Sequence, residues 1–239
     1  MKYIYGPLNS RRLGLSLGVS LVPYKICNFD CIYCQLGSTK HLAAEPKAYL
    51  APQEVIAEFK LWLENNSQEA EKLDYITISG AGEPTLNSAI AEVISQIKKL
   101  AAKPIAVITN ASLLGNPQIR VQLLEADLVV PSLDTVLPRV FQEINRPHQA
   151  IKIEEIIEGL VNFRKEFRGK IWLEVMLVSG ANDDIRQIKK LKEIIQRINP
   201  DKIQLNSPVR ATAEKNILPV NKAKLEKIKE ILGDNAEII

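Results

Sequence analysis

Three cysteines are the residues of this sequence whose type and spacing are best suited to chemistry. Cys27, Cys31 and Cys34 form the pattern C-x3-C-x2-C. Thiolates at this spacing can hold one compact metal centre from a single loop, and three of them leave one coordination position open. Their odd number and tight clustering favour metal binding over disulfide bonds.

Two kinds of metal centre fit these cysteines. An iron–sulfur cluster held by three thiolates keeps one iron free of protein ligands. Zinc is the alternative, because His41 follows Cys34 by seven residues and would complete a structural Cys3His site. The cysteines alone favour the cluster without excluding zinc.

Short motifs follow successive predicted strands, and they agree with the cysteines. They are Ser79-Gly80-Ala81-Gly82-Glu83-Pro84-Thr85, Thr109-Asn110-Ala111, Ser132-Leu133-Asp134 and Val178-Ser179-Gly180-Ala181-Asn182-Asp183. Together with Tyr33 before the third cysteine, this set resembles the radical S-adenosylmethionine (SAM) superfamily, with Ala81 and Ala111 in place of glycines. The segments 6–14 and 206–210 resemble a group of Fe–S oxidoreductases related to wybutosine-type tRNA modification proteins.

The resemblance implies one [4Fe–4S] cluster on Cys27, Cys31 and Cys34, S-adenosyl-L-methionine as cofactor, and a 5′-deoxyadenosyl radical as the product of reductive cleavage. It also implies an electron donor such as flavodoxin or ferredoxin. The SAM-binding residues that it implies are Tyr33, Gly80, Ala81, Gly82, Glu83, Asn110, Ser132, Asp134 and Asn182. No side chain is assigned a catalytic role.

Each of these residues also has an ordinary structural interpretation beside the functional one. Gly80–Glu83 would hold the methionine ammonium, and the alternative is an ordinary turn. Asn110 and Ser132 would contact the ribose or carboxylate and Asn182 the adenosine, or each would be a cap or turn residue. Tyr33 would pack on adenine or only seal the loop.

The substrate is less constrained than the cofactor. Polar residues outside the shared motifs are candidates for substrate contacts or for plain surface charge: Arg11, Arg12, Asn145, Arg146, His148 and Arg210. The first hypothesis is modification of a tRNA base, with tRNA or a protein covering an open side of the fold. The second is a glycyl-radical-enzyme activase, and the third a non-enzymatic zinc- or cluster-binding protein.

The absence of further cysteines narrows the reaction. With three in all, this sequence has no second cysteine-ligated cluster, which argues against auxiliary-cluster enzymes, methylthiotransferases and methyltransferases that need two more cysteines. The additional cluster cysteines of the wybutosine enzyme are also missing. Its reaction therefore does not carry over.

The elements that must position these residues alternate between strands and helices. The predicted strands are Leu17–Val22, Tyr75–Ser79, Ile105–Thr109, Leu128–Leu133, Ile171–Val178 and Ile203–Asn206. Helical apolar periodicity follows each strand, for example at Ile90, Val93, Ile94 and Ile97. Six such units predict an α/β protein with a partial (β/α)6 barrel, an open, curved parallel sheet, and one domain over residues 1–239.

The amino-acid composition further constrains the class of protein. The 239 residues are 46% hydrophobic and 25% charged, and the net charge is only +3. This is an ordinary globular composition, whose small net charge does not by itself indicate nucleic-acid binding. No apolar run has the length of a membrane span, and residues 1–19 lack the apolar core of a signal peptide. We therefore expect a cytoplasmic protein without a membrane partner.

Overall fold

Eight strands form one sheet in the order β1-β2-β3-β4-β5-β6-β7-β8 in the computed structural model, which describes residues 1–239. The strands are β1 Ile4–Ser10, β2 Gly14–Ser20, β3 Tyr75–Ser79, β4 Ile105–Thr109, β5 Leu128–Pro131, β6 Lys170–Met176, β7 Lys202–Asn206 and β8 Ala236–Ile238. The helices are α1 Pro52–Asn65, α2 Ser67–Lys72, the 3-10 helix η1 Pro84–Leu86, α3 Ile90–Leu100, α4 Pro117–Gln122, α5 Pro138–Ile144, α6 Ile153–Glu166, α7 Ile185–Ile198 and α8 Lys222–Leu232.

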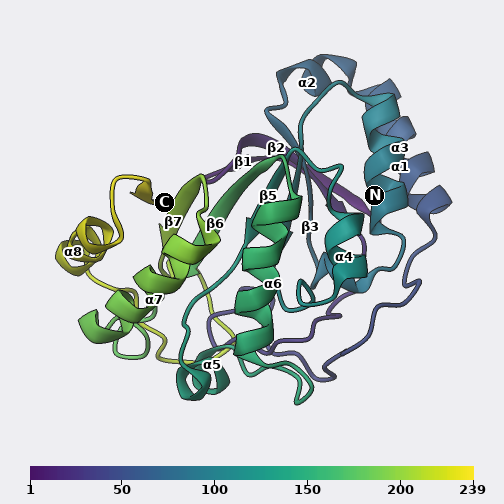
Figure 1. Ribbon diagram of the computed structural model, residues 1–239. Helices are drawn as coiled ribbons and strands as arrows, with labels where there is room; N and C mark the ends of the chain where they lie inside the picture. The colour runs from purple at the N-terminus through teal and green to yellow at the C-terminus, as the bar shows by residue number, and fades with distance from the viewer.

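The strands β2 to β8 are parallel, and β1 pairs antiparallel with β2. Because β1 and β8 are not neighbours, the sheet stays open (Figure 1). This confirms the predicted α/β partial barrel with an open parallel sheet. The count of six strands was too low, since β1 and β8 were missed. β1 contains Gly6 and Pro7 and mostly exposed or half-buried positions, and β8 has only three residues, so neither shows a buried apolar run.

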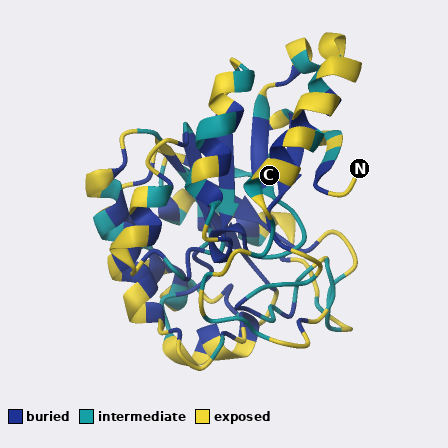
Figure 2. Cartoon of the chain, turned by 90° about the vertical axis from the view of Figure 1, so that its right-hand side faces the viewer, coloured by how far each residue is buried: buried dark blue, intermediate teal, exposed yellow.

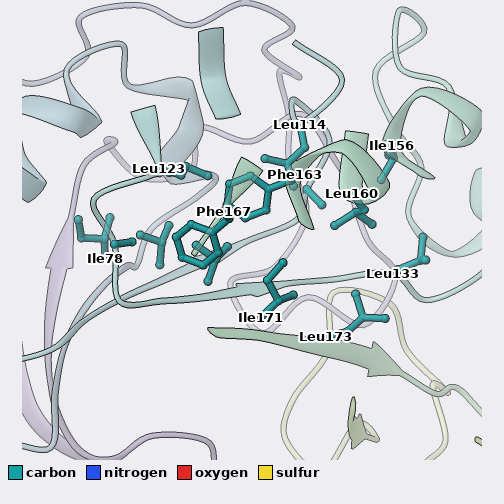
Figure 3. Packing of buried hydrophobic residues seen from close by; sticks show 14 of the residues in the cluster. Ile78, Leu114, Leu123, Leu133, Ile156, Leu160, Phe163, Phe167, Ile171 and Leu173 are labelled. Atoms are coloured by element: carbon teal, nitrogen blue, oxygen red, sulfur yellow. The ribbon is translucent and has the colours of Figure 1, made fainter. Parts of the chain in front are cut away.

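Helices cover one face of the sheet (Figure 1), and the main core of 49 buried residues lies between the two layers. The inward stripes of the helices are buried and their outer faces exposed (Figure 2). In α6, Phe163 stacks on Phe167, which follows the helix, with ring centroids 4.7 Å apart (Figure 3). These rings pack beside Ile171 of β6 and anchor the helix layer to the sheet.

The opposite face of the sheet is more polar. Strand residues alternate between the two faces. In β6, Leu173 and Val175 belong to the main core, whereas Glu174 points away from it. A small apolar cluster forms on this second face, where Leu13 of the β1–β2 turn packs against Ala106, Leu128 and Val130. The turn thus closes part of the open face and brings its neighbours Arg11 and Arg12 over the sheet.

None of the helices combines the length and the hydropathy that crossing a bilayer would require.

Candidate active site

The loop that carries the cysteines follows β2 and is held by main-chain hydrogen bonds to a distant segment. Asp30 N donates to Asn145 O at 3.1 Å, and Ile32 N donates to Ile144 O at 2.9 Å. His148 N donates in turn to Asn28 O at 2.8 Å. The end of α5 and the residues just after it therefore fix the cysteine loop almost as a neighbouring strand would.

The cysteine sulfurs lie among N–H donors. Asn110 Nδ2 lies 3.8 Å from Cys27 Sγ, and Phe29 N donates to the same sulfur at 3.5 Å. Asn145 Nδ2 donates to Cys31 Sγ at 3.6 Å. Burial raises the pKa of the Cys27 thiol to about 12 and also raises the pKa of Cys31. Half-buried cysteines whose sulfurs receive N–H donors suit thiolates whose charge a metal centre neutralises, so this loop fits an iron–sulfur cluster.

The zinc site considered from the sequence is not assembled. His41 is exposed and lines another cavity of about 600 Å³, together with His148 and Arg146. No three His, Cys, Asp or Glu side chains lie close enough together to bind a single metal ion. Because zinc holds sulfur at about 2.3 Å, its ligands must nearly touch, whereas a cluster accepts ligands that lie farther apart.

A cavity of about 700 Å³ joins the cysteine loop to the carboxyl ends of the parallel strands. Of the predicted site residues, it is lined by Cys27, Cys31, Gly80, Ala81, Gly82, Glu83, Asn110 and Ser132. Cys34 follows one turn after Cys31, with its N–H donating to Cys31 O at 3.0 Å. The end of the strands, where parallel α/β sheets gather their ligands, thus carries most of the predicted set.

The turn after β3 needs small residues to make this cavity. A Cβ on Gly82 would lie 1.7 Å from Ile26 O, so this glycine lets the turn touch the cysteine loop. Gly80 has a φ of +114°, a conformation that side chains other than glycine rarely adopt. The turn therefore exposes main chain, rather than side chain, to the cavity.

Glu83 is buried, and its carboxylate is saturated by donors from its own chain. Its Oε1 accepts from Thr85 Oγ1 at 2.6 Å and Thr109 Oγ1 at 2.7 Å, and its Oε2 accepts from Asn110 N at 2.7 Å. Burial raises the pKa of Glu83 even though these hydrogen bonds act in the opposite direction. The carboxylate ties the loop after β3 to the loop after β4, a positioning function that the motif alone did not indicate.

Asp134, Tyr33 and Asn145 form a second buried network. Asp134 accepts from Tyr33 Oη, from Asn145 Nδ2 at 2.7 Å, and from Met176 N at 2.9 Å. Burial raises the pKa of Asp134 to about 6. The three residues line a smaller cavity of about 40 Å³, which also includes Ser132. This network connects the cysteine loop to β6.

Asn182 and Ser132 differ sharply in how their side chains are used. Asn182 is buried, accepts from Val178 N at 2.8 Å, and donates to Met176 O at 2.8 Å and Asp134 O at 2.9 Å. It contacts the predicted residue Asp134 but lines neither of these two cavities, so the structure places its side chain behind the site rather than in it. Ser132 lines both, and no hydrogen bond within the chain engages its hydroxyl.

A charged group on β6 and β7 was not found from the sequence. Glu174 accepts from Arg12 Nη2 at 2.6 Å and from Asn206 Nδ2 at 3.0 Å. Arg11 Nη2 donates to Asn206 Oδ1 at 3.2 Å. Only the alternation of Glu174 with apolar neighbours in β6 could have indicated a buried charge, and nothing local pairs it with Arg12. Arg12 and Arg210 line the 700 Å³ cavity, whereas Arg146 is paired with Glu214 at 2.5 Å elsewhere.

Comparison with known proteins defines the class. The sequence model of the Radical SAM superfamily matches residues 21–191. The chain belongs to the radical SAM superfamily and is an enzyme of that class. Membership implies an iron–sulfur cluster and SAM.

Several proteins are similar to this chain in sequence. It is 36% identical over 241 residues to the UPF0026 protein MJ1312 of Methanocaldococcus jannaschii, covering 100% of this chain and 73% of that protein. It is 38% identical over 237 residues to a Brachyspira hyodysenteriae protein named GTPase Obg, covering 99% of this chain but only 34% of that protein. A probable dual-specificity RNA methyltransferase RlmN of Thermotoga petrophila is 29% identical over 223 residues, covering 89% of this chain and 61% of the relative.

Solved structures share the fold. A structure of TYW1 with a lysine-pyruvate adduct bound has a TM-score of 0.67 at 20% identity and covers 92% of this chain and 74% of that one. Streptococcus suis SuiB bound to S-adenosylmethionine has a TM-score of 0.66 at 17% identity and covers 93% of this chain and 49% of that one. At these identities the likeness concerns the fold alone.

Proposed function

We propose that Cys27, Cys31 and Cys34 hold one [4Fe–4S] cluster and that the 700 Å³ cavity beside them binds SAM. The observation that carries this proposal is that one cavity joins two of these cysteines to the turn after β3, Asn110 and Ser132. When bound, the cluster and SAM supply a 5′-deoxyadenosyl radical. The chain supplies positioning, enclosure and hydrogen bonds.

We assign the roles of the other predicted site residues from their positions and hydrogen bonds. The main chain of Gly80 to Gly82 faces the cavity and offers carbonyl acceptors to an ammonium group, while Glu83 holds this turn in place. Ser132 is the predicted polar residue whose hydroxyl is uncommitted, so it is our leading direct contact to SAM. Asn110 and Asn145 donate toward cysteine sulfurs and stabilise the ligated thiolates. Tyr33, Asp134 and Asn182 support the wall of the cavity.

We further propose that the substrate is an RNA, with a tRNA base as the group modified. The relative named RlmN acts on RNA by its name, and the open sheet leaves room for a large substrate. The three cysteines of this chain are all assigned to the cluster, so none is left for a modification that needs a further cysteine. An activase would instead act on a protein, and Arg11 and Arg210, which have no Asp or Glu partner, favour a polyanion.

The test is anaerobic. The protein is reconstituted with iron and sulfide, reduced, and mixed with SAM, with and without bulk tRNA. We expect a change in the cluster's EPR spectrum on SAM addition, formation of 5′-deoxyadenosine, and a new nucleoside mass in the tRNA digest. An EPR spectrum that SAM does not alter would refute the cofactor assignment. SAM cleavage that leaves tRNA unchanged but produces a glycyl radical on a partner protein would overturn the RNA substrate and favour the activase function.

A further inference from the structure

A second cavity of about 320 Å³ adjoins the SAM cavity. Its polar lining consists of Asn9, Ser10, Arg11, Arg12, Gln35 and Arg210, and we call it the arginine vestibule. Arg12, Gln35 and Arg210 also line the larger cavity. No Asp or Glu lines the vestibule, so any ligand group within it meets positive charge beside the space assigned to SAM.

Two of the three vestibule arginines have no Asp or Glu partner. Arg11 donates to Asn206 Oδ1 and to the main-chain oxygen of Ile239, both at 3.2 Å. Arg210 donates to the neutral Gln35 Oε1 at 3.3 Å. Of the seven arginines elsewhere in the chain, Arg168 and Arg186 form no ion pair, and the other five pair with Asp or Glu: Arg120, Arg139, Arg146, Arg164 and Arg197. The vestibule thus brings together three arginines of which only Arg12 is paired with an acidic side chain, although the net charge of the chain is small.

The third arginine is held in place rather than free. Arg12 Nη2 donates to the buried Glu174 at 2.6 Å, and Asn206 Nδ2 donates to the same carboxylate oxygen at 3.0 Å. Asn206 also accepts from Arg11, so one asparagine links both arginines of the β1–β2 turn. No hydrogen bond within the chain uses Arg12 Nη1. A guanidinium fixed in this way has lost its rotamer freedom before any ligand arrives.

We propose that the arginine vestibule binds a backbone phosphate of the RNA substrate next to the nucleotide that enters the SAM cavity. This inference rests on the proposed function and names how its substrate is held. Guanidinium groups bind phosphate through paired N–H donors. Asn, Gln and Ser side chains are also among the types that contact phosphate and sugar in nucleic-acid complexes. Arg11 comes from the β1–β2 turn and Arg210 from the loop after β7, so the phosphate would be held from two walls.

The experiment measures RNA binding by the reconstituted protein. Fluorescently labelled bulk tRNA is titrated at several KCl concentrations with the wild type, the double variant R11Q/R210Q, and a matched control K189Q/K190Q. Lys189 and Lys190 are exposed on α7 and lie in neither cavity, so the control removes the same charge elsewhere. Thermal unfolding of all three proteins verifies that they are folded, and the single variant R210Q, at an exposed residue, serves if the double variant does not fold.

We expect R11Q/R210Q to bind tRNA about tenfold more weakly at about 0.1 M KCl, because it loses two charge-assisted contacts. Its slope of log affinity against log salt should also fall by about 1 to 2. The control should retain wild-type affinity within about twofold. Equal losses in both double variants, or no loss in R11Q/R210Q, would overturn the proposal.

Two further arms separate this inference from its basis. Inorganic pyrophosphate should compete with tRNA for the wild type, whereas acetate at equal ionic strength should not; the reverse would assign the vestibule to a carboxylate and overturn the proposal. The SAM-dependent EPR change should be the same in wild type and in the single variant R11Q, because Arg11 lines the vestibule but not the SAM cavity. If wild type shows that change but binds no tRNA, the proposed RNA substrate is wrong. If R11Q/R210Q binds tRNA as tightly as wild type, only the proposed role of the vestibule is wrong.

Discussion

The two halves of the cavity wall are built by different means. The cysteine half, formed by the loops after β2 to β5, presents sulfur, main chain and neutral side chains, and its one carboxylate, Glu83, is saturated by the chain's own donors. The arginine half is formed by the β1–β2 turn and the loop after β7, which carry Arg12 and Arg210, and Glu174 of β6 holds Arg12 from behind. The first half depends on close approach of the backbone, and the second on charges balanced over a long distance in sequence. Variants can target either half, or the seam between them, where Asp134 links the cysteine loop to β6.

The largest effect is expected from the cysteine half. Cys31→Ser replaces a thiolate by a poorer ligand for iron. The reconstituted variant should lose most of its bound iron, and 5′-deoxyadenosine formation should fall to background. Iron and sulfide analysis with the visible spectrum measures the first, and product analysis the second. Retention of a full cluster by Cys31→Ser would show that a different set of ligands holds it.

Gly82→Ala tests whether this half depends on backbone contact. The new Cβ would meet Ile26 O at 1.7 Å, so the turn or the cysteine loop must move. We expect a loss of about 3 kcal/mol in the free energy of unfolding, typical of severe overpacking. Gly180→Ala is the control: no atom lies within 4 Å of its Cβ, and only its φ of +76° is strained, which costs about 1 kcal/mol. Equal losses in chemical denaturation would mean that the contact at Gly82 is unimportant.

Arg12→Gln tests the charge balance of the arginine half. It leaves Glu174, whose side chain is 6% exposed, without its cation. We expect a loss of roughly 2 kcal/mol, below the usual figure for a buried pair because Arg12 is itself partly exposed. Adding Glu174→Gln should restore about half of that loss, since no buried charge then remains unpaired. Denaturation of both single variants and the double variant measures this coupling, and purely additive losses would exclude it.

Asp134 lies at the seam, between the cysteine loop and β6. Its pKa of about 6 lies above the ordinary 3.8, so the folded apoprotein binds this proton more tightly than the unfolded chain. Its contribution to stability is therefore greatest below about pH 4 and declines as pH rises to about 6, by roughly 2–3 kcal/mol. Asp134→Asn should remove that part of the pH dependence. Apoprotein denaturation from pH 4 to 7 measures it, and identical pH profiles for the two proteins would contradict the assignment.

The same division explains what could be predicted from the sequence. The residues of the cysteine half are consecutive in short motifs at strand ends, and the six central strands are marked by buried apolar runs, so spacing and periodicity were sufficient. The partners Arg12 and Glu174 are 162 positions apart, and no local pattern joins them. The edge strands β1 and β8 lack the buried run that identifies a strand. The motifs also could not predict that the side chains of Glu83 and Asn182 use their hydrogen-bonding capacity within the chain. A motif fixes where a residue lies but not which groups its side chain contacts.

The smallest expected effect sharpens the comparison within the cysteine half, where most polar groups are already engaged. Ser132→Ala removes the one predicted polar contact whose hydroxyl no group in the chain uses, so the fold should lose less than about 0.5 kcal/mol. SAM affinity should fall about fivefold, the cost of one neutral hydrogen bond. Calorimetric titration of the reconstituted protein with SAM measures this, with the exposed Ser179→Ala as the matched control. If Ser132→Ala binds SAM as wild type does while Asn182→Ala loses binding without unfolding, the direct contact lies on the β6 side, and the SAM cavity extends across the seam.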